Sequence, residues 1–472
     1  MEKIYFVSKN VKKYAEIKEI LSDRFVVEEY PERIAELQVD QLDELVKDKA
    51  MQAFKIVKRP VVVEHTVLII DAFKGLPGLQ TSYFYKHMGY KEIYKYCAKK
   101  DNYQAIVRSM FCLCDGKKFL IGKGKEKGRI VDPDKNPEAT ETFDWDCIFV
   151  PKKNNPQKKT YAQMTLEEKN KRSMRRRAWE DLKKKNDTYL NDICVNNIGN
   201  DDSDKEFREL ARLIRQKKVM LFMGAGISAS VNFPTWDGLI KDLGVMQGYE
   251  GDLFQCYGEY MMLAEYVKNK GFDQLSEKIQ NKFQCTKDIM QKLEKSEIYK
   301  NIIKLKIPVI YTTNYDHLIE EYYGLKKEPY TRVVNINDMG DIESGSTRIM
   351  KFHGDIDYPE TIVLSESQYF KRMDFKSFMD LQLQADMLQY HILFLGYSLS
   401  DINIKLLMYL ARMRHEGAKG MKAYIFTATP NQIQKEVFEK NNIISFSGDC
   451  CDKKRGTSQF LENLVKAVDS CG

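Results

Sequence analysis

Residues 219–228 read VMLFMGAGIS, five apolar residues followed at once by a glycine pair and a serine. A short apolar run that ends in glycine is typical of a buried strand that turns sharply into a helix. Similar apolar segments recur downstream, separated by helical stretches, at 309–311, 348–352, 392–395 and 423–426. This alternation predicts an α/β fold with a doubly wound, Rossmann-like parallel sheet in the C-terminal half.

Polar residues follow four of these strands directly. They are GAGIS (224–228), TTNYD (312–316), HGD (353–355) and GYSLSD (396–401). Because ligands of open parallel sheets bind beyond the carboxyl ends of the strands, we expect these segments to form one site. The first segment also fits a G-x-G-x-x-G/A phosphate loop ending at Ala229, although no ribose-binding acid follows about 20 residues later.

In this order and spacing, the four motifs resemble the SIR2 family, over about residues 207–444. Sirtuins bind NAD⁺ and break its nicotinamide–ribose bond. The resemblance implies that Asn314 and His353 are catalytic. It implies contacts to the cofactor from Gly224, Ala225, Gly226, Ser228, Asp237, Asp316, Gly396 and Ser398.

Simple chemistry agrees with these assignments. Loss of a cationic nicotinamide passes through an oxocarbenium-like state, so the reaction needs a base of near-neutral pKa rather than a strong nucleophile. His353 suits that base, Asn314 can position a water molecule and Asp316 can hold ribose hydroxyls. A single histidine at a strand end is more often structural, but four motifs in register favour the catalytic interpretation. His317, His391 and His415 match no motif and are interpreted as structural or surface residues.

The chain departs from protein-deacetylating sirtuins in two ways. None of its ten cysteines forms a C-x-x-C pair, so we expect no zinc module. Residues 232–237 read NFPTWD where those enzymes have a G-I-P-D-F-R segment. Both departures resemble the SIR2-like NADases of bacterial anti-phage defence, and protein deacetylation ranks last among the functions considered.

The N-terminal half has a mixed α/β pattern. Strands are expected at 4–7 and 61–64, helices at 14–21 and 42–57, and a hairpin around Asp115-Gly116. The segment 183–205 is rich in Asn, Asp and Lys and has almost no apolar periodicity, which predicts a linker. The expected domains are therefore residues 1–182 and 206–472.

Residues 1 to about 182 resemble the HAM1, or inosine triphosphate pyrophosphatase, family. Among the motifs that carry this resemblance are FVSKNVKK (6–13), VVVEHTVL (61–68), GLPG (75–78) and FDWD (143–146). That family binds purine nucleoside triphosphates with a 6-oxo base, such as ITP, dITP or XTP. The implied nucleotide-binding residues are Ser8, Asn10, Lys13, Lys49, Phe143, Trp145, Asp146, Lys169 and Arg175.

One departure from the HAM1 pattern is informative. The family reads V-E-D-T where this chain has Val63-Glu64-His65-Thr66, and the missing Asp takes part in Mg²⁺ binding and water activation. Glu36 and Glu64 remain as the implied Mg²⁺ ligands, but imidazole is a poor substitute for a carboxylate. We interpret the domain as a nucleotide sensor with impaired hydrolysis; a slow but working pyrophosphatase is the alternative.

Composition limits the partners and the location of the protein. The net charge of +7 is small beside 75 basic and 68 acidic side chains, which favours local phosphate sites over duplex binding. No apolar run approaches the roughly 18 residues of a membrane span, and the N-terminal residues do not resemble a signal peptide. We therefore expect a cytoplasmic protein with no membrane partner, and nucleic acid is not an expected ligand.

The pairing of the two halves resembles Kongming-type anti-phage systems, in which a HAM1-like and a SIR2-like protein act together. There dITP, made by a deaminase during infection, triggers NAD⁺ depletion and abortive infection. The resemblance implies a (d)ITP-activated NAD⁺ glycohydrolase, a separate deaminase partner and a homo-oligomer. The alternatives are a purine nucleotide pyrophosphatase with a regulatory, NAD-binding SIR2 domain, and a binding module that recruits another effector.

Overall fold

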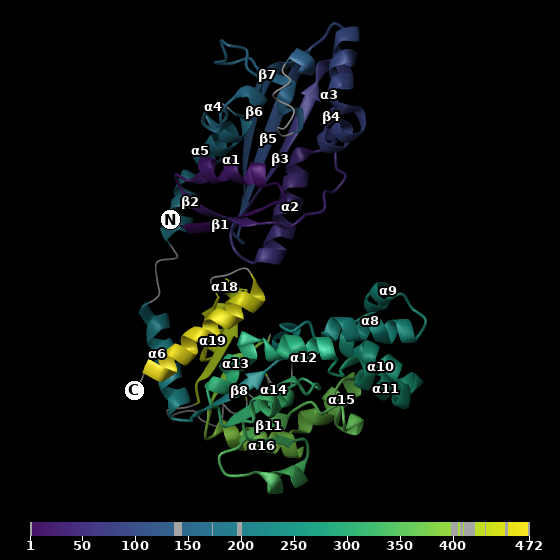
Figure 1. Ribbon diagram of the computed structural model, residues 1–472, viewed down its shortest axis with the longest axis vertical. Helices are drawn as coiled ribbons and strands as arrows, with labels where there is room; N and C mark the ends of the chain where they lie inside the picture. The colour runs from purple at the N-terminus through teal and green to yellow at the C-terminus, as the bar shows by residue number, and fades with distance from the viewer. Residues whose placement is uncertain are drawn as a thin grey trace. The chain divides into compact units, whose positions relative to one another are not determined.

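The computed structural model describes residues 2–135, 144–171, 173–195, 201–397, 405, 409, 421–429, 431–448 and 452–470. The chain divides into two compact units, Met1–Gly199 and Asn200–Gly472 (Figure 1). Each unit is an α/β structure built on its own seven-stranded sheet. The predicted fold class is confirmed for both halves of the chain.

A mixed sheet forms the centre of the first unit. Its strands are β1 (Glu2–Val7), β2 (Phe25–Tyr30), β3 (Val61–Ile70), β4 (Pro77–Gly78), β5 (Gln104–Cys114), β6 (Phe119–Ile130) and β7 (Phe149–Pro151). The strand order is β2-β1-β3-β5-β6-β7, with β4 paired to β3. Strands β2, β1 and β3 are parallel, whereas β3, β5, β6 and β7 pair in antiparallel fashion.

In the part of the first unit that the structure describes, five α-helices accompany this sheet: α1 (Val11–Leu21), α2 (Leu42–Val57), α3 (Thr81–Lys99), α4 (Leu166–Asn170) and α5 (Met174–Val195). Short 3-10 turns lie at Asp71–Phe73, Pro133–Lys135, Asp144–Cys147 and Tyr161–Gln163. Apolar residues of α1 and α5 form one core with β1 and β5, in which Ile17, Phe111 and Trp179 are buried. Helix α5 lies close enough to β6 that a Cβ on Gly124 would come within 1.9 Å of the Met174 carbonyl oxygen.

Part of the segment predicted as a linker belongs to the first unit. Helix α5 kinks at Asn186 and continues to Val195, and the side chain of Leu190 is fully buried in the core of this unit. Arg24 forms an ion pair with Asp187 at 2.6 Å. Residues 201–205 begin α6 (Asp201–Arg215). The buried Leu190, the ion pair of Asp187 and the hydrogen bond from the Tyr189 hydroxyl to Asp115 hold this polar helix, and none of them produces the apolar periodicity on which the linker prediction depended.

An all-parallel sheet forms the centre of the second unit. Its strands are β8 (Val219–Met223), β9 (Val309–Thr312), β10 (Tyr330–Val333), β11 (Thr347–Lys351), β12 (His391–Leu395), β13 (Ala423–Thr427) and β14 (Ile443–Ser447). The strand order is β10-β11-β9-β8-β12-β13-β14. The first strand, β8, is therefore central, and the chain adds strands on one side before it returns to the other. This reversal makes β8 the switch point of a doubly wound sheet.

Helices pack on both faces of the second sheet. Besides α6 they are α7 (Ala225–Ala229), α8 (Trp236–Met246), α9 (Gly251–Gln255), α10 (Tyr260–Lys270), α11 (Phe272–Lys282), α12 (Lys287–Glu294), α13 (Glu297–Lys304), α14 (Leu318–Lys326), α15 (Glu366–Lys371), α16 (Phe378–Met387), α18 (Gln432–Lys440) and α19 (Lys453–Ser470). Helix α19 lies against α6 and α13, as Figure 1 shows. Two buried apolar clusters result because alternate strand residues point to opposite faces, as Leu221 and Phe222 do.

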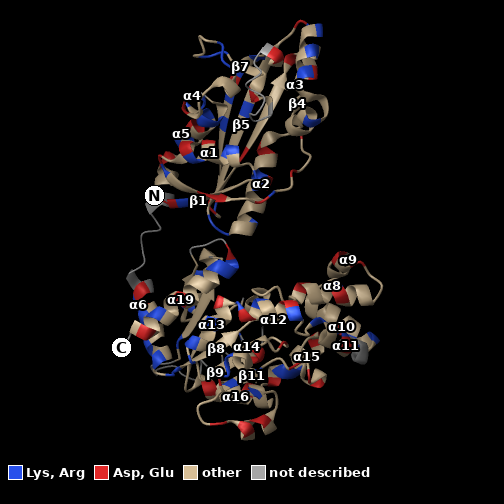
Figure 2. Ribbon diagram, viewed as in Figure 1, with Lys and Arg blue, Asp and Glu red and all other residues tan. Residues whose placement is uncertain are grey.

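Charged residues of both signs are mixed along both units, as Figure 2 shows. This mixture agrees with the small net charge of the sequence. None of the helices in the described part of the chain is both long and apolar enough to cross a bilayer.

The role of Leu190 gives a first prediction. Leu190→Ala should lower the free energy of unfolding of the first unit by about 2–5 kcal/mol, because it leaves a cavity in a closed core. Leu166→Ala is the matched control, since Leu166 is 44% exposed. Denaturant unfolding followed by tryptophan fluorescence measures both variants. An unchanged Leu190→Ala curve would mean that the end of α5 contributes nothing to this core.

Candidate functional site

The carboxyl ends of four strands in the second unit surround a cavity of about 690 Å³. Among its lining residues are the predicted Ala225, Gly226, Ser228, Asn314, Asp316, His353 and Gly396. They follow β8, β9, β11 and β12, the four neighbouring strands at the centre of the sheet. The volume lies within the range of roughly 300–1,000 Å³ that is usual for small-molecule sites. The sheet thus brings together residues that are 171 positions apart in the sequence, from Ala225 to Gly396.

The Ser228 hydroxyl connects two of these segments. It donates a hydrogen bond to Asp316 Oδ2 at 2.8 Å and accepts one from Asn314 Nδ2 at 2.9 Å. The other oxygen of Asp316 accepts from the backbone N–H of Leu318 at 3.1 Å. All three side chains are buried, so their orientations are fixed by these bonds.

His353 lies immediately beyond β11 and is 3% exposed. Its Nδ1 is 3.5 Å from the hydroxyl of Tyr369, whose ring meets the imidazole edge to face at 5.3 Å between centroids. Its carbonyl accepts from the Val363 N–H at 2.9 Å. Arg372 donates to the preceding carbonyl, that of Phe352, at 2.6 Å. The backbone and the ring of His353 are therefore both held in place.

Gly224, Gly226 and Gly396 allow two backbone segments to touch. The Gly226 N–H donates to the Gly396 carbonyl at 3.0 Å. A Cβ on Gly226 would lie 2.9 Å from the Gly396 Cα, and one on Gly224 would lie 2.5 Å from the Gly396 carbonyl oxygen. Gly396 itself has φ +62, a conformation that favours glycine. Close packing of the β8 and β12 ends thus requires these glycines, whether or not they also approach a phosphate.

Asp237 and Gly224, two of the predicted cofactor contacts, are not among the residues that line the cavity. Asp237 is exposed and does not line the cavity, because its carboxylate accepts hydrogen bonds from Tyr260 at 2.7 Å and Gln255 at 2.9 Å. These bonds lower the pKa of Asp237. Gly224 is also absent from the lining residues, and Ser398 lies outside the described residues.

Aromatic residues that sequence reasoning missed form much of the cavity wall. They are Trp236, Tyr260, Phe283, Tyr315, Tyr369 and Tyr397. Tyr397 follows Gly396 directly, so its position after a strand was visible in the sequence. Trp236, Tyr260 and Phe283 come from the helices between β8 and β9, and no motif marks them.

The first unit contains a buried charged cluster around Glu64 of β3. Lys13 of α1 lies 3.1 Å from Glu64 Oε2, and Ser109 of β5 donates to Oε1 at 2.7 Å. Arg175 of α5 approaches the same oxygen at 3.3 Å. Burial alone would raise the pKa of Glu64, but Arg175 and Lys13 hold it well below its usual range. The contacts with Lys13, Ser109 and Arg175 therefore favour the charged form of the Glu64 carboxylate.

A second group of buried charges joins α4, α5 and the turn at 144–147. Lys169 forms ion pairs with Glu16 at 2.5 Å and with Asp146 at 2.6 Å. Arg175 pairs with Glu16 as well. Burial raises the pKa of Asp146, whereas Arg175 and Lys169 together keep that of Glu16 low despite its burial. The structure thus brings together Lys13, Asp146, Lys169 and Arg175, all predicted from the HAM1 resemblance, and adds Glu16, which sequence reasoning missed.

Three other predicted nucleotide contacts, Ser8, Asn10 and Trp145, make contacts within the unit. The Asn10 side chain caps α1 by accepting from the Lys13 N–H at 3.0 Å, and the Asn10 N–H donates to Ser8 at 3.1 Å. Trp145 is 2% exposed and packs edge to face against Phe149 and Tyr161. Phe143 lies outside the described residues.

The implied Mg²⁺ ligands Glu36 and Glu64 do not form an oxygen cage. Glu36 pairs with Lys49 at 2.7 Å, and His65 Nδ1 lies 3.4 Å from the same Glu36 oxygen. The contact with His65 is the largest cause of the lowered pKa of Glu36. Mg²⁺ requires near-octahedral oxygen ligands, whereas here both carboxylates already neutralise cations and His65 offers nitrogen. We therefore assign no Mg²⁺ ion to these residues.

Comparison with known proteins agrees with the two-unit architecture. Residues 4–185 match the Ham1 family model, and residues 308–446 match a model described as a SIR2-like domain. The fold and the two domain matches thus define an α/β protein of two different units, one Ham1-like and one SIR2-like. The chain belongs, through its first unit, to the Ham1 family, here fused to a SIR2-like domain. The SIR2-like match begins after the glycine motif at 224–228, which the structure nevertheless places in the same cavity.

Two inosine triphosphate pyrophosphatases support the Ham1 assignment. Inosine triphosphate pyrophosphatase 2 of Trypanosoma cruzi is 34% identical over 182 residues, which are 38% of this chain and 90% of that protein. Inosine triphosphate pyrophosphatase of Kluyveromyces lactis is 36% identical over 186 residues, 38% of this chain and 93% of that protein. The solved structure of the Staphylococcus aureus Ham1 protein is 21% identical with a TM-score of 0.34, and the match covers 40% of this chain and all (100%) of that one.

Proposed function

We propose that the chain is an NAD⁺ glycohydrolase that a non-standard purine nucleotide, dITP or ITP, activates through the Ham1 unit. In this proposal the second unit cleaves NAD⁺ into nicotinamide and ADP-ribose, and the first unit senses the nucleotide. The observation that carries it is the cavity in which Ser228, Asn314, Asp316 and His353 meet. The SIR2-like domain match independently implies use of NAD⁺.

The buried polar end of the cavity supports glycosidic cleavage. Nicotinamide departs as a neutral molecule with the electron pair of the broken bond and leaves the positive charge on the ribose, so the catalyst must stabilise an oxocarbenium-like ribose and activate a weak nucleophile. His353 supplies the base, and Asn314 positions a water molecule beside it. Asp316 holds ribose hydroxyls while Ser228 fixes both Asn314 and Asp316 through the bonds at 2.9 and 2.8 Å.

The charges of the first unit support a sensor that retains its ligand. Lys13, Lys49, Lys169 and Arg175 are four cations that could exchange their carboxylate partners for phosphate or base oxygens. His65 Nε2 is buried with no hydrogen-bond partner among the described residues, so it can donate to or accept from a bound nucleotide. A ligand that is bound without hydrolysis can hold a shifted population of the chain.

Such a protein suits anti-phage defence by abortive infection. Unregulated loss of NAD⁺ would kill the host, so the activity must wait for a signal that infection produces. A coupling of about 1–3 kcal/mol per site is typical of allosteric proteins, and assembly into a homo-oligomer would sharpen the response. A separate deaminase would supply dITP. These elements of the proposal rest on the combination of domains in one chain.

A second function has specific support. The relatives named inosine triphosphate pyrophosphatase are 34% and 36% identical to the first unit, and Glu36 and Glu64 are present. The alternative is therefore an active pyrophosphatase of non-standard purine nucleotides, with a regulatory NAD-binding SIR2-like domain. It predicts release of pyrophosphate from dITP, whereas the sensor does not.

One assay separates the two functions. Purified full-length protein is incubated with NAD⁺ alone and then with ATP, ITP or dITP, while nicotinamide and pyrophosphate are measured in the same samples. We expect nicotinamide release only with an inosine nucleotide, its loss by about 100-fold or more in His353→Ala, and little pyrophosphate. Pyrophosphate release with intact NAD⁺ would instead establish the alternative.

His65 gives a gain-of-function prediction. His65→Asp supplies a third carboxylate beside Glu36 and Glu64, so Mg²⁺-dependent release of pyrophosphate from dITP should rise by about tenfold or more. His65→Asn is the control, since it removes the imidazole without adding a charge. Equal, unchanged rates for wild type and both variants would show that position 65 does not limit hydrolysis.

A further inference from the structure

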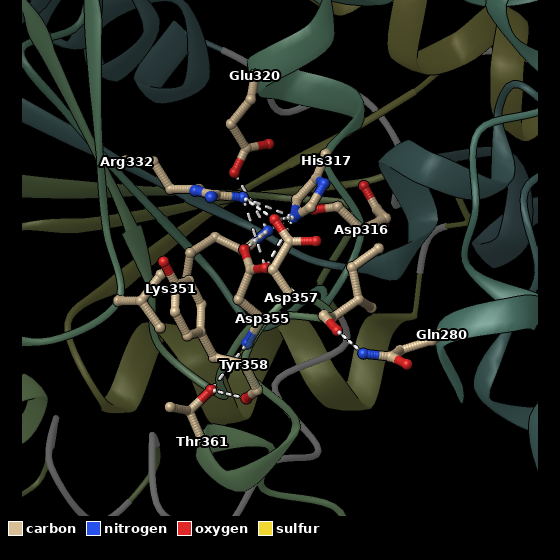
Figure 3. A network of polar contacts seen from close by, with 12 residues as sticks. Gln280, Asp316, His317, Glu320, Arg332, Lys351, Asp355, Asp357, Tyr358 and Thr361 are labelled. Atoms are coloured by element: carbon tan, nitrogen blue, oxygen red, sulfur yellow. Dashed lines mark hydrogen bonds and ion pairs between the residues drawn. The ribbon is translucent and has the colours of Figure 1, made fainter. Parts of the chain in front are cut away.

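A buried ionic network, drawn in Figure 3, adjoins Asp316, which lines the cavity of the second unit. Its centre is Lys351, the last residue of β11, whose side chain has no exposed surface. The Lys351 ammonium donates a hydrogen bond to the backbone carbonyl of Asp316. It also forms ion pairs with Glu320 Oε1 at 3.2 Å and Asp355 Oδ2 at 3.4 Å. A single cation thus contacts the loop that follows β9, the helix α14 and the loop that follows β11.

The outer part of the network closes around Asp355. His317 Nε2 lies 2.7 Å from Asp355 Oδ1, and Arg332 of β10 lies 2.8 Å from Asp357 Oδ2. His317, Asp355 and Asp357 are close enough together to suggest a cation site. However, the Arg332 guanidinium already occupies that position, 2.9 Å from His317 Nε2. The cluster is therefore an ion-pair network and not a metal site.

Electrostatics favours the charged forms of Lys351 and Asp355, whereas burial raises the pKa of Glu320. Burial alone would lower the pKa of Lys351, but Glu320 and Asp355 raise it above its usual value. Burial would raise the pKa of Asp355, but the hydrogen bond with His317 and the charge of Lys351 lower it to about 2. Removing one partner of a buried ion pair strongly destabilises the folded protein. Lys351, Glu320 and Asp355 therefore hold one another in a single arrangement.

The contacts of Lys351 extend to the reacting groups. Asp316, whose carbonyl Lys351 binds, orients Ser228 and through it Asn314. His353 lies two residues after Lys351, and the turn between them is closed by the Gly354 N–H, which donates to the Lys351 carbonyl at 3.1 Å. The two loops also meet through the Ile356 N–H and the Tyr315 carbonyl at 3.3 Å. None of Lys351, Glu320 and Asp355 lines the cavity.

The geometry assigns to Lys351 the role of a positioning residue for the proposed cleavage of NAD⁺. It fixes the loop that carries Asn314 and Asp316 against the loop that carries His353, so that the base and the ribose-binding groups face one substrate. This role rests on the proposed function of the same cavity. Lys351 acts through Asp316 and the loop backbone and does not touch the substrate.

The test compares Lys351→Gln with Arg348→Gln in the full-length chain. Arg348 is a matched control because it lies on the same strand and pairs with the buried Asp386 at 2.9 Å, away from both loops. We expect Lys351→Gln to lower kcat for nicotinamide release by about tenfold or more, since small displacements of reacting groups greatly slow the chemical step. KM for NAD⁺ should change by less than about threefold, because Lys351 is not among the residues that line the cavity. Arg348→Gln should lower the melting temperature while kcat stays at the wild-type value.

The activity and folding of these variants decide whether Lys351 positions the two loops. A folded Lys351→Gln with wild-type kcat, or equal losses of kcat in both variants, would overturn the inference. If Lys351→Gln does not fold, the double variant Lys351→Gln/Glu320→Gln removes one buried anion with the cation and carries the same expectation. Failure of the double variant to fold, while Arg348→Gln folds, would assign Lys351 to stability alone. If the wild type itself releases no nicotinamide with dITP, ITP or ATP, the proposed function fails along with this inference.

Discussion

The parallel direction of β8, β9, β11 and β12 is the constraint on which the second unit depends. Parallel strands end at the same edge of a sheet, so four segments from distant parts of the sequence must meet there. The glycines at 224, 226 and 396 let the segments after β8 and β12 touch, and Ser228 then bonds to Asn314 and Asp316. The polar end of the cavity follows from this convergence, and the helices between β8 and β9 add Trp236 and Tyr260 to its aromatic wall.

Buried charge is the second common feature of the two units. Glu64 and Arg175 in the first unit, and Lys351 and Asp355 in the second, are almost completely inaccessible to solvent. Burying isolated charges is costly, and such groups contribute to a fold only when each has a partner of opposite charge in a fixed place. In the second unit the partners hold two loops together. In the first unit the partners neutralise Lys13, Lys169 and Arg175, so in the proposed sensor a nucleotide would have to exchange one set of ion pairs for another.

Much of the fold could be predicted from the sequence. Apolar runs such as Val219–Met223 and the helix Leu42–Val57 are found where their periodicity placed them. Strand β10 was not predicted, because Tyr330–Val333 reads YTRV and is a half-exposed strand at the edge of the sheet. The end of α5 was predicted as a linker because its sequence is polar. Among its described residues a single leucine, Leu190, is fully buried, and one apolar residue gives no periodicity.

The sites were predictable only where residues follow strands or match motifs. Asn314 and His353 could be found because each lies just after an apolar run, whereas Tyr260 and Phe283 reach the cavity from helices whose packing no local pattern encodes. His317 was expected to be structural or on the surface, and its contact with Asp355 supports a structural role. Lys351 was not singled out, because the burial of a lysine depends on acceptors that lie far away in the sequence.

We propose that a nucleotide held by the first unit turns on cleavage of NAD⁺ in the second. The most direct measurement is the rate of nicotinamide release as a function of dITP concentration, for the wild type and for Lys49→Gln. Lys49 pairs with the half-exposed Glu36, so this variant should fold. We expect the midpoint to move to about tenfold higher dITP, or beyond, while the maximal rate is unchanged, since only the sensor has lost a phosphate-binding charge. An unchanged midpoint would contradict the assignment of the Ham1 unit as the sensor.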